Sequence, residues 1–174
     1  TAGLQWTPSD DTLVYFTYAR GAKSGGFNLG SFAREPVDTE SVDAFELGWK
    51  QDFGDQLRIN SSIFHYIYNG MQLPNFTVPS PGVSLPILVN MQEVVSDGAE
   101  IELRWRPTDA LTVLVNYSYL HSEITDGCCF IDEANPYATL YGALSNQVGP
   151  PDAGGNILQS VDGNAAPYAP EHKL

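Results

Sequence analysis

The chain has 174 residues, enough for one ordinary domain, and its 21 acidic against 8 basic residues give a net charge of −13. A nucleic-acid-binding protein needs a basic face, so this balance argues against nucleic acid as a partner. No run approaches about 18 apolar residues, so no transmembrane helix is predicted. The two cysteines, Cys128 and Cys129, are adjacent and cannot link distant segments, so the fold does not depend on disulfides.

The predicted elements are β-strands. Gly, Pro and β-branched residues interrupt every candidate helix, whereas several segments alternate in polarity with a period of two residues. In chain order, complete strands are expected at 12–23, 45–51, 57–69, 98–106 and 111–124, with strand remnants at 3–6 and in the final "PEHKL". The alternation within 57–69 is lost part-way, which is typical of a bulge.

The last two complete strands separate most clearly into two faces. Because side chains alternate across a strand, residues of one parity share a face. In 98–106 the apolar side holds Ile101, Leu103 and Trp105, and the other side holds Glu100, Glu102, Arg104 and Arg106. In 111–124 the apolar side holds Val113 and Val115, and the polar side holds Asn116.

Short and long connections alternate along the chain. Tight turns are expected at 7–11, 52–56 and 107–110, and long loops rich in Gly, Pro, Asn and Ser at 24–44, 71–97 and 126–170. In an up-and-down antiparallel sheet, alternate connections fall at opposite ends, so the tight turns share one end and the long loops the other. Loops above about 15 residues are uncommon in compact soluble domains, whereas outer-membrane barrels have this asymmetry.

Each tight turn is preceded by a tryptophan. Trp6 and Trp105 each stand two residues before the proline of a turn, and Trp49 stands three residues before Asp52. At about 3.3 Å per residue, all three are expected at nearly one depth. Trp prefers the membrane–water interface, so these three are predicted lipid-interface aromatics, on a convex face that contacts lipid. The alternative is a β-sandwich whose core tryptophans happen to lie near turns.

The polar face is then predicted to be concave and to line a lumen. Glu100, Glu102, Arg104 and Arg106 would cost several kcal/mol each in lipid, but they hydrate or pair inside a barrel. Five or six strands are too few for a membrane-spanning barrel, which starts at about eight, and lipid does not tolerate open sheet edges. The predicted fold class is therefore all-β: a partial curved sheet of about five to six strands from a larger, antiparallel, up-and-down transmembrane β-barrel.

Five stretches resemble, in order, a series found in TonB-dependent receptors. "YFTYARGAKSGGFN" resembles their Tyr-Ser-Arg-Gly-x-x-x-Gly-Gly-Phe-Asn segment. "SVDAFELGWKQDF" is similar to the Glu-x-x-Glu-Leu-Gly-x-Lys segment that follows, with Asp43 replacing the first Glu or a neighbour of it. The strands that come next there resemble "LRINSSIFHYIYNGMQ", "GAEIELRWRPTDALTVLVNYSYLHSEI" and "NAAPYAPEHKL". The series covers most of the chain and looks most like receptors of sphingomonad-type bacteria.

The resemblance implies a 22-stranded barrel in the outer membrane of a Gram-negative bacterium, occluded by an N-terminal plug domain. Such receptors import scarce, large substrates: most often ferric siderophores, otherwise cobalamin, haem or oligosaccharides. The implied partners are outer-membrane lipid and lipopolysaccharide, the receptor's own plug, the TonB energising complex and a small-molecule substrate such as a ferric siderophore. Residues 1–174 are expected to be one piece of the later half of the barrel, without the plug, the TonB box or the C-terminal strand.

An imported substrate arrives from outside and meets the long loops first. The substrate-binding candidates are therefore residues at the loop end of the strands and in the longest loop, namely Arg20, Lys23, Phe27, Tyr68, Asn69, Gln72, Tyr137 and Tyr141. Arg and Lys suit anionic oxygens, and Tyr and Phe suit aromatic or sugar faces. The structural alternative is that Arg20 only pairs with an acidic neighbour such as Glu46. The tight turns are expected to be too short to form a pocket.

No catalytic residues, metal or cofactor are predicted. Five metal-ligand types fall close together, at His121, Glu123, Asp126, Cys128 and Cys129, but their spacing fits no standard zinc pattern. A vicinal disulfide between the cysteines is an alternative. No Ser-His-Asp or paired-carboxylate arrangement stands out, so the chain is not expected to be an enzyme. Two other functions stay open: a soluble or surface β-domain that binds carbohydrate, such as an adhesin or carbohydrate-binding module, and a passive porin.

Overall fold

The computed structural model describes residues 1–28, 36–80, 83–130, 147–150, 157–167 and 169–174, with the backbone alone at 75–80, 83–86 and 129–130. The long strands are β1 (Ala2–Ser9), β2 (Thr12–Lys23), β3 (Glu40–Phe53), β4 (Leu57–Ser80), β5 (Val83–Thr108) and β6 (Leu111–Asp126). Three short strands follow: β7 (Cys128–Phe130), β8 (Gln159–Ser160) and β9 (His172–Lys173). In the described part of the chain, no helix is long and apolar enough to cross a membrane.

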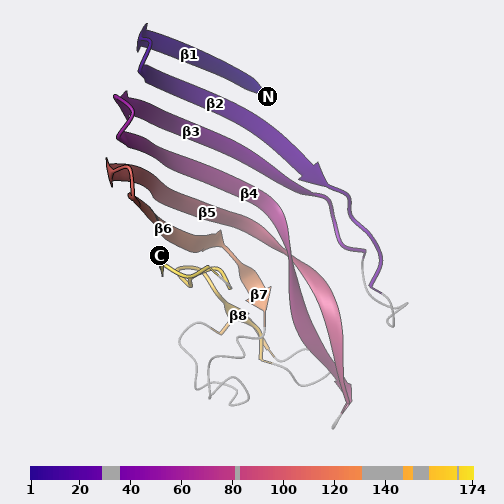
Figure 1. The fold of residues 1–174 in the computed structure, drawn as a ribbon. Coiled ribbons are helices and arrows are strands. Elements are labelled where there is room, and N and C mark those ends of the chain that lie inside the picture. Colours follow the sequence, from indigo (N-terminus) through magenta and orange to yellow (C-terminus); the bar gives the residue numbers. More distant parts are fainter. Residues whose placement is uncertain (29–35, 81–82, 131–146, 151–156, 168) are drawn as a thin grey trace.

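The strands pair with their neighbours in the chain. Within the residues described, one seven-stranded antiparallel sheet has the order β1-β2-β3-β4-β5-β6-β9, and β7 and β8 form a separate two-stranded ribbon. Figure 1 shows this up-and-down order as a single curved layer. The predicted antiparallel pairing in chain order is therefore confirmed. The β-sandwich alternative is wrong, because the long strands all belong to one sheet rather than to two packed sheets.

All three tight turns lie at one end of the sheet, called here the turn end, and β2, β4 and β6 end at the other, the loop end (Figure 1). The β3–β4 turn depends on Gly54, which has a φ of 58° in the left-handed region that favours glycine. The predicted segregation of turns and loops is thus confirmed.

The second long connection is a correction to the sequence prediction. Residues 71–97, expected as a loop, continue β4 and β5 as a long hairpin that pairs from Met71↔Met91 to Ser80↔Val83. In Figure 1 this hairpin extends beyond the other strands. Its prolines resemble strand breakers in the sequence, but a two-stranded ribbon tolerates proline where the missing N–H would point away from the partner. Similarly, β3 begins at Glu40 rather than at residue 45.

The two predicted end remnants also join the sheet. The first is β1, which pairs with β2 from Ala2↔Tyr18 onward. The second is β9, and the segment before it follows the free edge of β6 irregularly: Ile124 N donates to Asn164 O, and Leu120 N donates to Glu171 O. The sheet thus has seven strands among the described residues, where five complete strands and two remnants were expected.

The buried apolar side chains gather at the loop end. Val94 is fully buried and packs with Met91, Ile124, Val161 and Ala166, beneath the segment that returns toward β9. A soluble domain would bury its core along the middle of its sheet. Here the middle of the sheet keeps large hydrophobic side chains exposed, for example Ile63 and Leu47.

Candidate functional site

The strand register places all three tryptophans on one face. Trp6 pairs with Val14, which pairs with Trp49. The same row continues to Ser61 and Ile101, and Trp105 shares the parity of Ile101 on β5. Paired residues share a face of a sheet. This face, called here the apolar face, also carries Leu47, Ile63, Leu103, Val113 and Val115. That it contacts lipid stays a prediction.

The opposite side, called here the polar face, carries the charged residues predicted to line a lumen. Glu100, Glu102, Arg104 and Arg106 alternate with the apolar set on β5. In register, Glu46 pairs with Phe64, which pairs with Gly98, and Arg58 pairs with Arg104. Neighbouring strands therefore add to this face the residues Glu46, Lys50, Asp52, Arg58 and Asn60. Asn60 Nδ2 donates to Glu102 Oε2 at 3.2 Å. The lumen assignment stays a prediction, but the separation of charged from apolar side chains is a property of the register.

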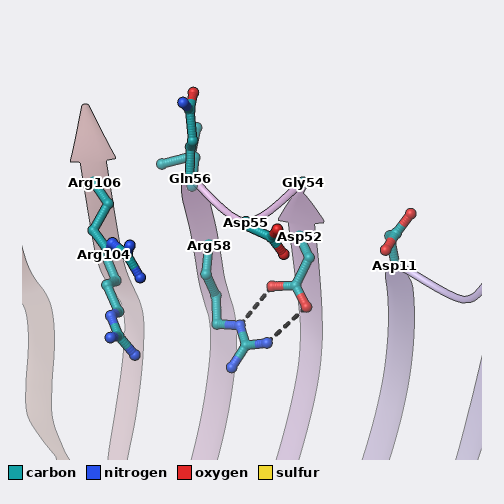
Figure 2. Close-up of a pocket in the computed structure, with 9 residues that line it drawn as sticks. Asp11, Asp52, Gly54, Asp55, Gln56, Arg58, Arg104 and Arg106 are labelled. Carbon is teal, nitrogen blue, oxygen red and sulfur yellow. Dashed lines mark hydrogen bonds and ion pairs between the residues drawn. The ribbon is translucent and has the colours of Figure 1, made fainter. Parts of the chain in front are cut away.

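A pocket of about 480 Å³ lies at the turn end of the polar face (Figure 2). Its lining residues are Asp11, Asp52, Gly54, Asp55, Gln56, Leu57, Arg58, Arg104 and Arg106. Arg58 donates to both carboxylate oxygens of Asp52, at 2.5 Å from Nε and 2.7 Å from Nη2. The expectation that the turn end has no pocket was therefore wrong: the turns are short, but long side chains on the strand ends form the walls.

At the loop end, side-chain amides fasten the connection after β2 to the β4–β5 hairpin. Gln72 is buried, and its Nε2 donates to Ser24 O at 3.1 Å and to Asp38 O at 3.0 Å. Asn90 donates to Asp38 O and Gly70 O and accepts from Asp38 N at 2.8 Å. The Gln72 amide is thus occupied by backbone groups.

Asn28 makes a second attachment of the same connection. Its Oδ1 accepts from Leu88 N at 2.7 Å, and its Nδ2 donates to Leu88 O at 3.0 Å, as a paired strand would. Gly26 and Val37 also form a β-bridge. A Cβ on Gly25 would lie 2.2 Å from Val37 O, so glycine is required where the two arms of this connection meet.

The substrate-binding candidates are not brought together on one face. Arg20 and Asn69 have the parity of the apolar face, and Arg20 Nη1 lies 3.8 Å from Asp43 Oδ2, so its acidic neighbour is Asp43 and not Glu46. Lys23 and Tyr68 have the parity of the polar face, where Lys23 pairs with Glu40.

Three further substrate-binding candidates are Phe27, Tyr137 and Tyr141. Phe27 is 82% exposed in the connection after β2. Tyr137 and Tyr141 lie outside the described residues.

A polar row at the loop end of the apolar face was missed by sequence reasoning. Tyr18 Oη donates to Asp43 Oδ1 at 2.6 Å, and His65 Nδ1 lies 2.7 Å from Asp97 Oδ1. His121 pairs in register with Asp97. These residues share the parity of Leu47 and Ile101, so strand alternation alone could have placed them together. They mark where the apolar face ends, opposite the tryptophans of the turn end.

The possible metal ligands do not converge. His121 Nε2 lies 3.6 Å from Glu123 Oε2, and in the described part of the chain no group of three His, Cys, Asp or Glu side chains could hold a metal ion. Cys128 is disulfide-bonded. The side chain of Cys129 lies outside the described residues, so a vicinal pairing stays a prediction.

The connection before β9 has its own anchor, beyond the long strands. Asp162 accepts from Gly127 N at 2.5 Å and from Ser160 Oγ at 2.7 Å. The Ser160 hydroxyl, and then the Gly127 amide, lower the pKa of the Asp162 carboxyl below its ordinary value. The ionised carboxylate therefore holds this segment against the end of β6.

Comparison with known proteins decides the family. The family described as "TonB dependent receptor-like, beta-barrel" matches residues 1–174, the whole chain. The chain belongs to this TonB-dependent receptor family. Its open antiparallel sheet is accordingly part of a receptor barrel, and a barrel of this family lies in the Gram-negative outer membrane. The family consists of transporters and not enzymes, which agrees with the sequence prediction.

Two known receptors resemble the chain. It is 29% identical over 133 residues to the "Probable TonB-dependent siderophore receptor PiuA" of Acinetobacter baumannii, covering 71% of this chain and 17% of that protein. The crystal structure of PiuA covers 98% of this chain, with a TM-score of 0.65 at 23% identity, and is matched over 22% of its own length. The ferric yersiniabactin uptake receptor FyuA of Yersinia pestis covers 71% of this chain, with a TM-score of 0.57 at 24% identity and 18% of its length matched.

Family membership also decides between the functions left open by the sequence. A receptor barrel accounts for the open sheet and for the two separated faces, whereas an adhesin, a carbohydrate-binding module or a passive porin would not match this receptor family along the whole chain. The chain spans about a fifth of the length of the relatives it matches. Neither relative comes from a sphingomonad, and that source stays a prediction.

Proposed function

We propose that this chain is part of the wall of a TonB-dependent receptor that imports a ferric siderophore across the outer membrane, with energy from the TonB complex. The observation that carries the proposal is the family match along all 174 residues. The siderophore substrate is supported by PiuA, which carries that name, and by FyuA, a ferric yersiniabactin uptake receptor. The plug, the TonB box and the C-terminal strand then belong to the remainder of a longer receptor.

The proposed contacts with substrate lie at the loop end. Lys23, on the polar face, provides a cation for the anionic oxygens of a ferric chelate. Phe27 offers an exposed aromatic ring and Tyr68 a half-buried one. Arg20 and Asn69 lie on the other face, so their contact with substrate would be above the membrane, where loops surround the opening. Gln72 holds the connection after β2 in place instead.

The test uses the full-length receptor in its own host. Deletion of its gene should abolish growth on at least one ferric siderophore as the only iron source, while growth on inorganic iron is kept. Radioactive iron uptake then compares Lys23→Ala, Phe27→Ala and Tyr68→Ala with Lys50→Ala, which removes a cation from the same face toward the turn end. A loss of about tenfold in affinity is expected for each loop-end variant, and none for the control.

Two results would contradict the proposal. Growth on cobalamin, haem or an oligosaccharide could be lost instead of growth on ferric siderophores, which would leave the receptor assignment intact and change the substrate. Alternatively, all three variants could bind and import iron as wild type does while the barrel stays folded. The substrate site would then lie elsewhere in the receptor.

A further inference from the structure

The pocket at the turn end of the polar face contains three arginines that nothing in the proposed transport cycle requires. Arg58, Arg104 and Arg106 account for three of the 8 basic residues in a chain of net charge −13. All three reach the pocket from two adjacent strands, β4 and β5. Figure 2 shows the guanidinium groups of Arg104 and Arg106 pointing toward the side of Arg58.

Their register places like charges against each other. Arg58 and Arg104 are directly opposed across the β4–β5 pair, and Arg106 is the diagonal neighbour of Arg58. Like charges directly opposite on a sheet are destabilising. Proteins break such local rules mainly at functional sites, so a like-charge pair that faces a pocket indicates a functional site.

In the described part of the chain, the acidic residues nearby form ion pairs with two of the three arginines but not with Arg104. Asp52 accepts two hydrogen bonds from Arg58, and Arg106 Nη2 lies 3.6 Å from Asp109 Oδ1, on a side chain that is fully exposed. Asp11 and Asp55 line the same pocket from the turns, and neither forms an ion pair with an arginine among the described residues. Arg104 has no hydrogen-bond or ion-pair partner in the described part of the chain.

We propose that this pocket is an oxyanion-binding site, in which Arg104 binds a carboxylate or phosphate group with help from Arg106 and from the free edge of Arg58. A guanidinium group presents a planar fork of donors that matches a carboxylate or phosphate in a bidentate way. One edge of Arg58 remains available, because the group has five N–H donors and Asp52 occupies two of them. The bound anion removes the repulsion between Arg58 and Arg104.

The same chemistry can come from two sources. One is a free small anion at the turn end. The other is an Asp or Glu side chain from another segment of the receptor, since the chain spans about a fifth of the length of its relatives. Either source supplies an oxyanion that Arg104 can bind. The inference does not depend on which substrate the receptor imports.

The experiment measures thermal unfolding of the purified full-length receptor in detergent at low ionic strength. Wild type is compared with Arg104→Gln and with Lys173→Gln, which removes one exposed positive charge from the same face outside the pocket. Each protein is heated with citrate, with inorganic phosphate and with sodium chloride at equal ionic strength. Arg104→Lys, which keeps the charge but loses the fork, is the conservative variant.

For a free anion, citrate or phosphate raises the unfolding temperature of wild type and of Lys173→Gln above the value in sodium chloride. Binding to Arg104→Gln is then weakened at least about tenfold. For a carboxylate of the receptor itself, added anions have no effect. Arg104→Gln then lowers the unfolding temperature more than Lys173→Gln does, by a difference that shrinks in high salt. In both cases the result for Arg104→Lys lies between those for wild type and Arg104→Gln.

The sign of the Arg104→Gln effect is what can overturn the inference. Without any bound anion, Arg104 makes no ion pair in the described part of the chain, so Arg104→Gln unfolds at the same temperature as Lys173→Gln or at a higher one. That result, together with no Arg104-dependent response to citrate or phosphate, would show that the pocket holds no oxyanion.

Discussion

The ring of Tyr15 covers Gly48 across the β2–β3 pair. The two residues are directly opposed in register, and a Cβ on Gly48 would lie 2.1 Å from Tyr15 Cζ. In this position the Tyr15 hydroxyl donates to Glu46 Oε1 at 2.5 Å, and Lys50 Nζ lies 5.7 Å from the ring centroid. The glycine thus lets one aromatic ring lie flat on the polar face and hold Glu46 in place.

Gly48→Ala should destabilise the full-length receptor by about 1–3 kcal/mol, because the new methyl group displaces the ring and its hydrogen bond to Glu46. Unfolding in denaturant measures the loss. The same substitution made in a Tyr15→Ala background should cost clearly less, since the obstacle is gone. Equal costs in the two backgrounds would mean that the ring does not rest on Gly48.

Gly98→Ala should cost more than Gly48→Ala. Phe64 covers Gly98 in the same way, but a Cβ there would also lie 2.6 Å from the backbone oxygen of Tyr119. A ring can rotate away, whereas a carbonyl within a β-ladder moves only if the strands separate. Truncating Phe64 to Ala should therefore rescue Gly98→Ala only in part, in contrast to the near-complete rescue expected at Gly48. The same denaturant titration provides the comparison, and full rescue would contradict it.

Val113→Arg should destabilise the barrel by about 2–4 kcal/mol if Val113 sits near the middle of the membrane. Asn116→Arg is the matched control, because Asn116 lies on the polar face of the same strand, is exposed and pairs in register with Glu102. Folding titrations into lipid vesicles measure both. A neutral Val113→Arg, or an equally costly Asn116→Arg, would show that lipid and lumen have been assigned to the wrong faces.

The attachment of the segment before β9 should weaken in acid. The carboxyl of Asp162 has a pKa lowered from the ordinary value of 3.8 by Ser160 and Gly127. A lowered pKa means that the stabilisation is present above about 3.8 and is lost as the pH falls through the lower, folded-state value. Hydrogen–deuterium exchange of 157–166 should therefore be slower in wild type than in Asp162→Asn at neutral pH. The difference should vanish well below pH 3.8, and equal protection at neutral pH would contradict the anchor.

Strand alternation and turn spacing were sufficient to predict the central part of the sheet. Once Leu47, Leu103 and Val115 are placed on one face, the register follows, because shifting a strand by one residue would turn its apolar side chains to the polar face. The observed register agrees: Trp49 pairs with Ser61, and Ser61 pairs with Ile101. The length of the β4–β5 hairpin could not be predicted in this way, since its prolines hide a ladder that depends on which N–H groups face the partner.

The candidate sites were predicted less well, for a related reason. Periodicity places a residue on a face but does not say what its polar atoms will contact. Gln72 looked like a ligand-binding residue at the end of a strand, and it proved to be buried against the backbone of Ser24 and Asp38. The pocket around Arg104 was missed because it depends on arginines from two strands separated by a long hairpin. Only the register between β4 and β5 brings them together.

The amide attachments at the loop end make two surface segments mechanically dependent on each other. Gln72, Asn90 and Asn28 tie the connection after β2 to the hairpin, so a displacement of one is passed to the other. A chimeric receptor that exchanged only one of the two would lose the backbone acceptors or the amide donors of this attachment. Grafting between related receptors would therefore have to transfer both segments as a single module.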